Sequence, residues 1–387
     1  MHETALIVEK KDFEMKTAII TLPLHTNYGG LLQAYALKTV LESLGNEVTV
    51  VDMKDKMPLP IWYKAPFIYV SRALKKLLKP SSKVEVFREL NYRRMLPARS
   101  QHTRKFVDRF IAPRIVDSYR DIRNGEYDAF VVGSDQVWRP RYFGNIEDAF
   151  LKFTADWPVK RVAYAASFGT DQLEYDYEAL EECSKLLAGF NAVSVREDVA
   201  VGMCEEWFGY EGAAHVLDPV MMLDADIYRR LAAESAEHSC KGKIMTYFLD
   251  PTREKECVVE FISKVSGKEV APVPQGSVAA PVEQWLAGFC DADYVVTDSF
   301  HGCVLSILLH KPFVAVGNSM RGMARMNSLL SVFGLDGRLV QGIDPEDDGE
   351  YWLAEPDWVT VDAVLAEQRS RSLDFLVAAL KMEVANG

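Results

Sequence analysis

Apolar residues along the chain follow two spacings that alternate with each other. Residues 17–22 form a short run rich in β-branched side chains, and residues 30–44 are apolar at every third or fourth position, which is typical of a helix that buries one face. Gly45 ends this helix, and residues 47–51 form a second apolar run. The order strand, helix, strand predicts a parallel, Rossmann-like opening unit.

The same alternation continues along the rest of the chain. Three more short strands are expected at residues 129–132, 162–167 and 192–195, and each ends in polar residues. From Lys243 onward, further strands and helices are expected at residues 244–248, 253–266, 270–273, 281–291, 294–297, 302–310 and 313–316. The sequence therefore predicts an α/β protein with two doubly wound, Rossmann-like domains, whose ligands bind in the crevice beyond the carboxyl ends of the strands.

A chain of 387 residues is too long for one ordinary core and suits two domains. We expect an N-terminal domain over 15–208 with a helical insertion at about 58–112, a C-terminal domain over 209–365, and a helix over 366–387 that packs back on the first domain. Residues 1–14 are polar and aperiodic and are expected to form a disordered extension.

The formal net charge of −12 excludes a broad basic face for nucleic acid, so an anionic substrate needs a local pocket of arginine and lysine. One stretch, residues 72–109, is locally basic and carries apolar residues between its charges. It predicts a solvated amphipathic helical insertion, and docking on an anionic membrane or on a lipid-linked acceptor is the alternative.

The six cysteines form no Cys-x-x-Cys pair and have no histidine at a spacing suited to zinc, so we expect no metal site and a reducing compartment. No apolar run reaches the about 18 residues of a membrane-spanning helix, and the N-terminus lacks the pattern of a secretory signal. We therefore expect a cytoplasmic protein, which would work at the inner face of the membrane if the basic insertion docks there.

The first candidate motif is Asn27-Tyr28-Gly29-Gly30, between the first strand and its helix. Paired glycines let a ligand approach the backbone, and the helix start offers free N–H groups to an anion. Asn27, Gly29 and Gly30 are therefore candidate donor-binding residues. A tight turn between strand and helix explains the same residues, and the dinucleotide fingerprint Gly-x-Gly-x-x-Gly is not present.

The second candidate motif spans residues 132–138 and offers Ser134, Asp135, Gln136 and Trp138. The polar side chains suit sugar hydroxyls, and the indole offers a flat face on which a sugar can stack. These residues are candidates for binding an acceptor sugar. The alternative is that they cap a helix and fill a core.

The third candidate motif, residues 297–302, is expected at the end of a buried strand and the start of an apolar helix. His301 can titrate near neutral pH, and the helix start at Gly302 favours an oxyanion or a phosphate. Arg196, after a strand of the other domain, could hold a carboxylate with two hydrogen bonds. A structural histidine and an arginine paired within the protein are the alternatives.

Together these stretches resemble the polysaccharide pyruvyl transferase family. The resemblance spans residues 15 to about 340 and is carried by residues 27–30 leading into 33–35, and by residues 132–138, 164–169, 195–197, 217–219 and 298–302. It implies a two-lobed fold similar to GT-B glycosyltransferases, with an interlobe cleft. It also implies transfer of a pyruvyl group from phosphoenolpyruvate, as co-substrate and without a required metal or other cofactor, to a sugar or lipid-linked oligosaccharide, in the biosynthesis of a bacterial exopolysaccharide or capsule of the cell envelope.

By this resemblance, His301 matches the histidine of an Arg-x-His motif that holds the donor and assists proton transfer, and Arg196 matches an arginine after a first-lobe strand. One position departs from the family pattern, because Ser299 stands where better-known members carry arginine. We expect Arg321 or Arg325 to supply the missing charge. The alternatives are a GT-B glycosyltransferase that uses a nucleotide sugar, and a catalytically inactive glycan-assembly protein.

Overall fold

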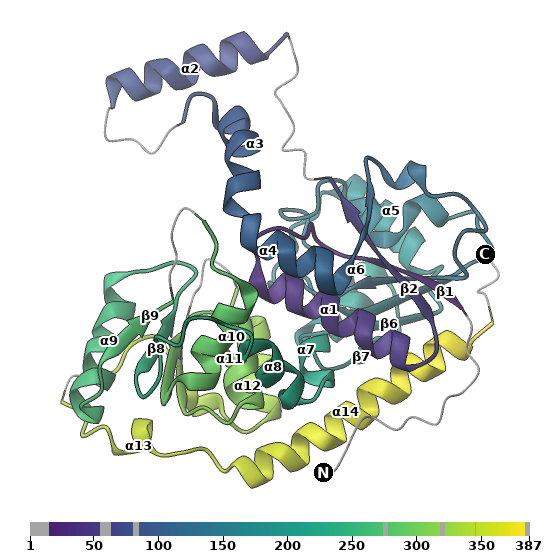
Figure 1. Cartoon of the computed structure of the whole chain (residues 1–387). Helices are drawn as coiled ribbons and strands as arrows, with labels where there is room; N and C mark the ends of the chain where they lie inside the picture. The colour runs from purple at the N-terminus through teal and green to yellow at the C-terminus, as the bar shows by residue number, and fades with distance from the viewer. Residues whose placement is uncertain are drawn as a thin grey trace.

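The computed structural model describes residues 15–54, 63–79, 85–273, 278–317, 322–344 and 346–383. They form two lobes, with one long helix lying along both of them and a helical arm rising from the first (Figure 1). The expected extension over residues 1–14 lies outside the described residues.

The first lobe is built on a parallel sheet of seven strands in the order β3-β2-β1-β4-β5-β6-β7, which changes direction between β1 and β4. Its strands are β1 Lys16–Ile20, β2 Glu47–Met53, β3 Arg114–Val116, β4 Ala129–Gly133, β5 Lys160–Ala166, β6 Ala192–Val195 and β7 Ala214–His215. Its helices include α1 Tyr28–Ser43, α5 Tyr177–Leu187 and α6 Val199–Phe208, with short helices η2 Tyr119–Asp121, η3 Ile146–Phe150 and η4 Lys152–Thr154.

The second lobe has a parallel sheet of five strands in the order β12-β11-β10-β8-β9, which changes direction between β8 and β10. Its strands are β8 Ile244–Tyr247, β9 Val270–Pro272, β10 Tyr294–Thr297, β11 Phe313–Val316 and β12 Leu339–Val340. Its helices are α7 Pro219–Met222, α8 Ala225–Ala232, α9 Arg253–Ser266, α10 Val282–Asp291, α11 Phe300–Leu308, α12 Ala324–Val332, η6 Asp336–Arg338 and α13 Glu350–Leu353.

The predicted α/β class with two doubly wound, Rossmann-like lobes is confirmed. All residues of β4 and β10 are buried. Strands covered by helices on both faces are apolar at successive positions rather than at alternate ones, and this is why both elements are visible in the sequence as short continuous runs.

The sheet places the end of the first lobe later than the predicted boundary at residue 208. Strand β7 pairs with β6 through Ser194 opposite Ala214 and Val195 opposite His215, so the first lobe continues to His215. Gly209 and Gly212 both have a positive φ and belong to the turn between α6 and β7, not to a passage between lobes.

The two lobes share one apolar core along their junction. Its buried side chains come from α1 of the first lobe and from α7, α10 and α11 of the second. At the centre, the ring of Tyr28 stacks on that of Trp285 with centroids 4.9 Å apart, and its hydroxyl donates to the carbonyl of Ala280 at 3.0 Å.

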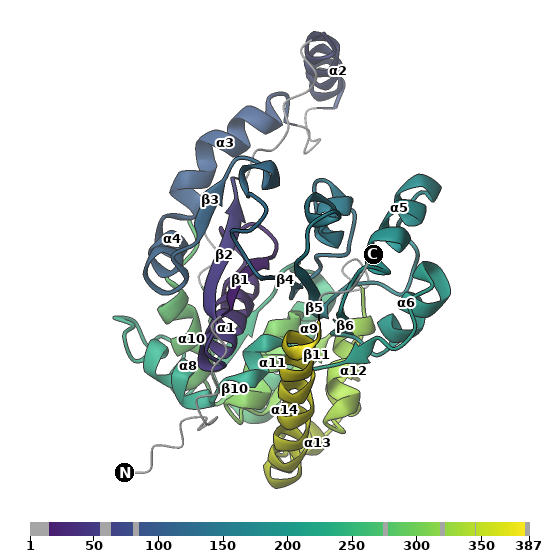
Figure 2. The ribbon, with the colours of Figure 1, turned by 90° about the vertical axis from the view of Figure 1, so that its right-hand side faces the viewer.

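Helix α14, Trp358–Lys381, joins the lobes from outside (Figures 1 and 2). Near its start, Asp362 accepts a hydrogen bond from His310 of the second lobe at 2.8 Å. Near its end, the carbonyl of Leu380 accepts one from Lys160 of the first lobe at 2.6 Å. The helix thus begins eight residues before the predicted position 366 and crosses from one lobe to the other.

The insertion contains helices α2 Ala65–Leu78, α3 Arg88–Arg99, α4 Gln101–Phe106 and the π-helix η1 Val107–Ile111. Within the described ranges, none of the helices combines the length and the apolar character needed to cross a bilayer.

Candidate active site

Three of the predicted motifs meet where the lobes touch. Asn27 and Gly29 follow β1, and Asp135 follows β4, so they lie at the point where the first sheet changes direction. His301 follows β10, at the corresponding point of the second sheet. Ligands of open parallel sheets bind at such positions, and here the two positions face each other.

His301 packs directly against the start of α1. A Cβ added to Gly29 would lie 1.9 Å from Nδ1 of His301, so only glycine allows this approach. The imidazole is 8% exposed as a side chain and stands perpendicular to the ring of Phe300, with centroids 5.2 Å apart. The backbone opening that was predicted to receive a ligand at Gly29 is filled by this histidine, and the one at Gly30 borders the side chain of Asn27.

Asp218 connects the two lobes electrostatically. Its Oδ2 accepts a hydrogen bond from Nη1 of Arg196 at 2.7 Å and lies 3.6 Å from Nε2 of His301. Its Oδ1 accepts from the backbone N–H of Val220 at the start of α7. Burial opposes ionisation of this carboxyl, but His301 and Arg196 outweigh it and hold the pKa of Asp218 well below its usual value.

Arg196 is occupied by protein carboxylates. Besides Asp218, its Nη2 donates to Oδ1 of Asp135 at 3.1 Å, and Asn27 donates to the other oxygen of Asp135 at 3.2 Å. Burial lowers the pKa of Arg196, but the carboxylates of Asp218 and Asp135 raise it by more, so the pKa lies above its usual value. The predicted two-bond clamp is therefore made to two aspartates, and in this arrangement Arg196 positions them.

Asp135 itself has a φ of 65°, a left-handed conformation that aspartate tolerates better than most residues. Although burial raises the pKa of its carboxyl, Arg196, His301 and Arg325 lower it more. Asp135 therefore stays ionised between the two lobes.

Arg325 points into the junction from α12. Its side chain is buried, and its guanidinium carbon lies 5.7 Å from the ring centroid of Phe300, beside that of Arg196 at 4.6 Å. Burial and the neighbouring charge of Arg196 lower the pKa of Arg325 to about 10, which leaves it charged at neutral pH. Arg321, the other predicted source of positive charge, lies outside the described residues.

Ser299 caps helix α11. Its hydroxyl accepts the N–H of Gly302 at 3.4 Å, and a Cβ on Gly302 would lie 2.4 Å from Oγ1 of Thr297. The preceding Asp298 is held by a buried ion pair with Lys255 at 2.6 Å. The strand-to-helix turn that presents His301 is thus fixed by its own polar side chains.

Trp138 has no exposed face, so its prediction as a stacking surface for a sugar is wrong for this conformation. Its side chain is fully buried, its ring stacks on Phe150 with centroids 5.0 Å apart, and its N–H donates to the carbonyl of Ala149. Ser134 and Gln136 are also buried, and both are bonded within the protein. The hydroxyl of Ser134 donates to Asp218 at 3.4 Å, and the side-chain carbonyl of Gln136 accepts from Arg139 at 3.0 Å.

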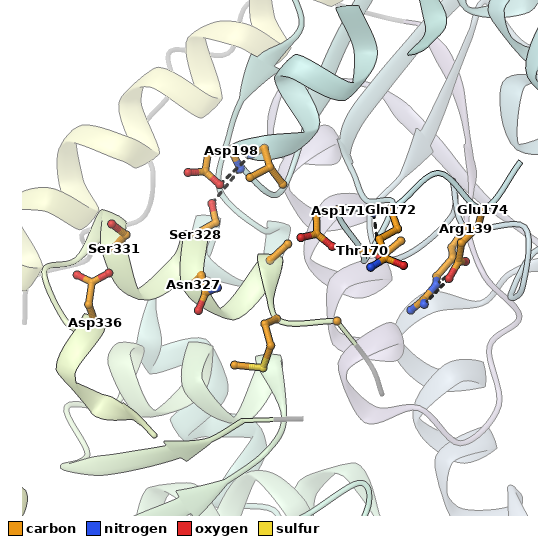
Figure 3. A pocket seen from close by; sticks show the side chains of 14 residues that line it. Arg139, Thr170, Asp171, Gln172, Glu174, Asp198, Asn327, Ser328, Ser331 and Asp336 are labelled. Carbon is orange, nitrogen blue, oxygen red and sulfur yellow. Dashed lines mark hydrogen bonds and ion pairs between the residues drawn. The ribbon is translucent and has the colours of Figure 1, made fainter. Parts of the chain in front are cut away.

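An open cavity of about 490 Å³ lies between the lobes beside this cluster (Figure 3). Arg139, Thr170 and Asp198 line it from the first lobe, and Asn327 and Ser328 face them from α12. Arg139 is itself held by Glu174 at 2.7 and 2.8 Å. The cavity offers hydroxyl, amide, guanidinium and carboxylate groups in one place, which suits a polyhydroxyl ligand.

Two site residues were not singled out from the sequence. Asp218 lies in the stretch 217–219 that carries the family resemblance, but it was given no role, although an Asp-Pro pair is a typical helix start. Glu197 is fully buried, and its Oε1 accepts from the hydroxyl of Ser167 and from the N–H groups of Phe168 and Gly169. Its position directly after Arg196, at the end of a predicted strand, was the sequence feature that could have identified Glu197 as a site residue.

Across the ranges that the structure describes, no group of three or more histidine, cysteine, aspartate or glutamate side chains is arranged to hold a metal ion.

Among solved structures, similar ones are Medicago truncatula UGT71G1 complexed with UDP-glucose (11% identity, TM-score 0.47, covering 95% of this chain and 98% of that one) and a UDP-GlcNAc 2-epimerase from Methanocaldococcus jannaschii in complex with UDP-GlcNAc and UDP (11%, 0.45, 95% and 99%). At these identities the likeness concerns the fold alone. None of the curated proteins matches the chain in sequence.

The sequence profile described as polysaccharide pyruvyl transferase matches residues 27–320. This span covers most of the chain and includes Asn27, Asp135, Arg196, Asp218 and His301, the residues that meet at the junction. The chain belongs to the polysaccharide pyruvyl transferase family.

Proposed function

We propose that this protein transfers a pyruvyl group from phosphoenolpyruvate to hydroxyl groups of a sugar in a surface glycan or its precursor. The observation that carries the proposal is the buried group of His301, Asp218, Arg196 and Arg325 at the junction of the lobes of a chain from this family.

The proposed reaction begins with transfer of a proton to the methylene carbon of the donor, while a sugar hydroxyl forms a bond to C2. The bond between C2 and the phosphate oxygen then breaks, and phosphate leaves with the electron pair. A second hydroxyl of the same sugar closes the cyclic ketal. The two hydroxyls release two protons, of which one replaces the proton given to carbon and the other leaves with phosphate or solvent.

His301 is the proposed proton donor, because histidine is the side chain that most often acts as a general acid, and its Nε2 lies 3.6 Å from Oδ2 of Asp218, which can orient the ring. Arg196 keeps Asp218 in place. Arg325 and the start of α11, where Ser299 caps the N–H of Gly302, are proposed to bind the donor anion, since a guanidinium and a helix start both favour phosphate or carboxylate.

The acceptor sugar is proposed to enter from the interlobe cavity and not from the indole of Trp138. Arg139 links the cavity to the predicted acceptor residue Gln136, which is next in sequence to Asp135. The imidazole of His301 fills the space beside Gly29, so a donor can bind there only if His301 moves away. We propose that the lobes open for binding and close for reaction.

The test follows phosphate release and the mass of the acceptor during incubation with phosphoenolpyruvate and a panel of lipid-linked or nitrophenyl sugars. We expect one acceptor to gain the mass of a pyruvyl ketal. In His301→Gln, kcat should fall about a hundredfold or more, because general acid catalysis contributes about that factor. His238→Gln is the matched control, since the side chain of His238 is 45% exposed and is bonded to Asp291, which is not one of the candidate site residues.

A glycosyltransferase would behave differently. Stabilisation by a ligand that binds only the folded protein reaches about 2.7 kcal/mol at a hundred times its Kd, so melting curves distinguish the donors. Stabilisation by nucleotides or nucleotide sugars, with none by phosphoenolpyruvate, would contradict the proposal. Full activity of His301→Gln would contradict the assigned role of the histidine.

A further inference from the structure

Helix α2 stands away from the body of the protein at the end of the arm formed by α3 (Figures 1 and 2). It has 14 residues and none of them is buried. Its contacts with described residues outside the helix include a two-bond ion pair between Arg72 and Glu89 and the rings of Tyr69 and Phe87 with centroids 5.0 Å apart. These contacts join the middle of α2 to the start of α3.

The exposed side chains of α2 include large apolar groups. Phe67 is 79% exposed, Leu77 76% and Leu78 85%, and Val70 and Leu74 are more than half exposed. At 100° per residue these five positions fall within one face of the helix. A continuous apolar face in water is unfavourable, and it marks an interaction surface.

The charges of α2 lie on the opposite face and have one sign. Residues 63–79 contain four lysines, one arginine and no acidic residue, in a chain whose net charge is −12. Lys75, Lys76 and Lys79 follow the polar side of the helix. A short helix with aliphatic and aromatic groups on one side and lysines on the other is the arrangement that lies flat in the headgroup region of an anionic bilayer.

We propose that α2 binds the surface of an anionic membrane, with Phe67, Leu74 and Leu78 between the headgroups and the lysines against lipid phosphates. Charge complementarity selects this occupant, because residues 63–79 carry only positive charges in a chain that is acidic as a whole. Lysine side chains reach phosphate groups while their methylene stems cover apolar surface. This inference does not depend on the transfer reaction.

The arm also relates the membrane to the candidate active site. Helix α3 ends at the junction of the lobes, where the carbonyl of Arg99 accepts a hydrogen bond from the N–H of Ala279 at 3.0 Å. Exposed Arg93 and Arg94 lie along α3 between this point and α2. A membrane-bound α2 would therefore hold the junction near lipid headgroups, at a distance set by α3.

The experiment uses the full chain in flotation with vesicles of phosphatidylcholine alone or mixed with phosphatidylglycerol. Binding is expected with the mixed vesicles and should weaken as salt is raised, because screening shortens the reach of the lysine charges. Phe67→Ser/Leu78→Ser should lower the partition constant about tenfold or more, through lost apolar burial. Lys75→Glu/Lys76→Glu should lower it about tenfold or more as well, through charge reversal.

Two matched variants control for general effects of polarity and charge. Val359→Ser removes an equally exposed apolar group from α14, and Lys241→Glu/Lys264→Glu reverses two exposed charges on the second lobe. Both should bind vesicles as the natural protein does. The substituted positions are all exposed, so each variant should keep its melting temperature.

Three results would overturn the proposal. The first is no binding to the mixed vesicles at low salt. The second is equal loss of binding in the α2 variants and in the controls. The third is self-association of the protein in sedimentation that Phe67→Ser/Leu78→Ser abolishes, without any vesicle binding. That last result would assign the apolar face to a second copy of the chain.

Discussion

Gly29→Ala perturbs the junction by a single methyl group. The new Cβ would lie 1.9 Å from Nδ1 of His301 and 2.4 Å from its Cγ, whereas ordinary contacts begin near 3.4 Å. The imidazole must therefore retreat by about 1.5 Å or the lobes must separate by that distance. Phe300 and Asp218 stand on other sides of the ring, at 5.2 Å between centroids and 3.6 Å between atoms, so the space for a retreat is small.

The expected cost follows from these contacts. Adding a methyl group to a packed position costs about 1–3 kcal/mol. A displacement of about 1 Å in a catalytic group costs about a hundredfold in rate. We therefore expect Gly29→Ala to lower kcat about a hundredfold and to lower the free energy of unfolding by about 1–3 kcal/mol.

The measurements are steady-state kinetics with phosphoenolpyruvate and chemical denaturation of each variant. Gly202→Ala is the control, because nothing lies within 4 Å of its Cβ position in α6, and it should stabilise the protein by about 0.4–1 kcal/mol. In the double variant Gly29→Ala/His301→Ala, the methyl group enters space that the imidazole has left, so the stability losses should not add. Unchanged activity and stability of Gly29→Ala would refute the close approach of the two lobes.

Four other substitutions test separate parts of the site. Asp218→Asn should lower the free energy of unfolding by about 3–5 kcal/mol at neutral pH, since it leaves buried Arg196 with one partner fewer. The low pKa of Asp218 stabilises the fold above the unfolded value of about 4, and this contribution is lost as the pH falls below it, so melting curves of the variant should depend less on acid. Arg325→Met should raise KM for phosphoenolpyruvate about ten- to hundredfold with little change in melting temperature, and in the natural protein KM should rise as the pH passes about 10. Trp138→Ala should lower the free energy of unfolding by about 3–5 kcal/mol, because Trp138 is fully buried. Asn327 lines the cavity, so Asn327→Ala should change the KM for the acceptor and leave the melting temperature unchanged.

The convergence of Asn27, Asp135 and His301 was predictable because parallel strands end at one edge of their sheet. Each residue follows a buried strand that is visible as an apolar run, and the rule for open sheets then brings the three together. Their mutual contacts were not predictable in the same way. The sequence does not show that the imidazole of one lobe fills the space above a glycine of the other, since this depends on how the lobes pack.

Three sequence predictions differ from the structure because local pattern does not determine what a residue packs against. Trp138 carries a polar N–H, which is compatible with a sugar site or with a core, and the carbonyl of Ala149 satisfies it inside the core. Strand β7 has only two residues and lies after two glycines, so local pattern did not mark it as part of the first sheet, and the domain boundary was predicted after residue 208. Helix α14 was expected only from residue 366 because its apolar positions change sides along its length, with its first turns against His310 and its last against β5.

The balance of charge at the junction bears on how an anionic donor is held. Two guanidinium groups, those of Arg196 and Arg325, interact with three buried carboxylates, those of Asp135, Asp218 and Glu197. Without His301, these five side chains carry one more negative charge than positive charge. The two guanidinium groups are therefore already balanced by carboxylates of the protein in this arrangement. If the proposed donor binds here, it must compete with Asp135 and Asp218 for the guanidinium groups of Arg196 and Arg325, and this is a physical reason for the lobes to open before the donor enters.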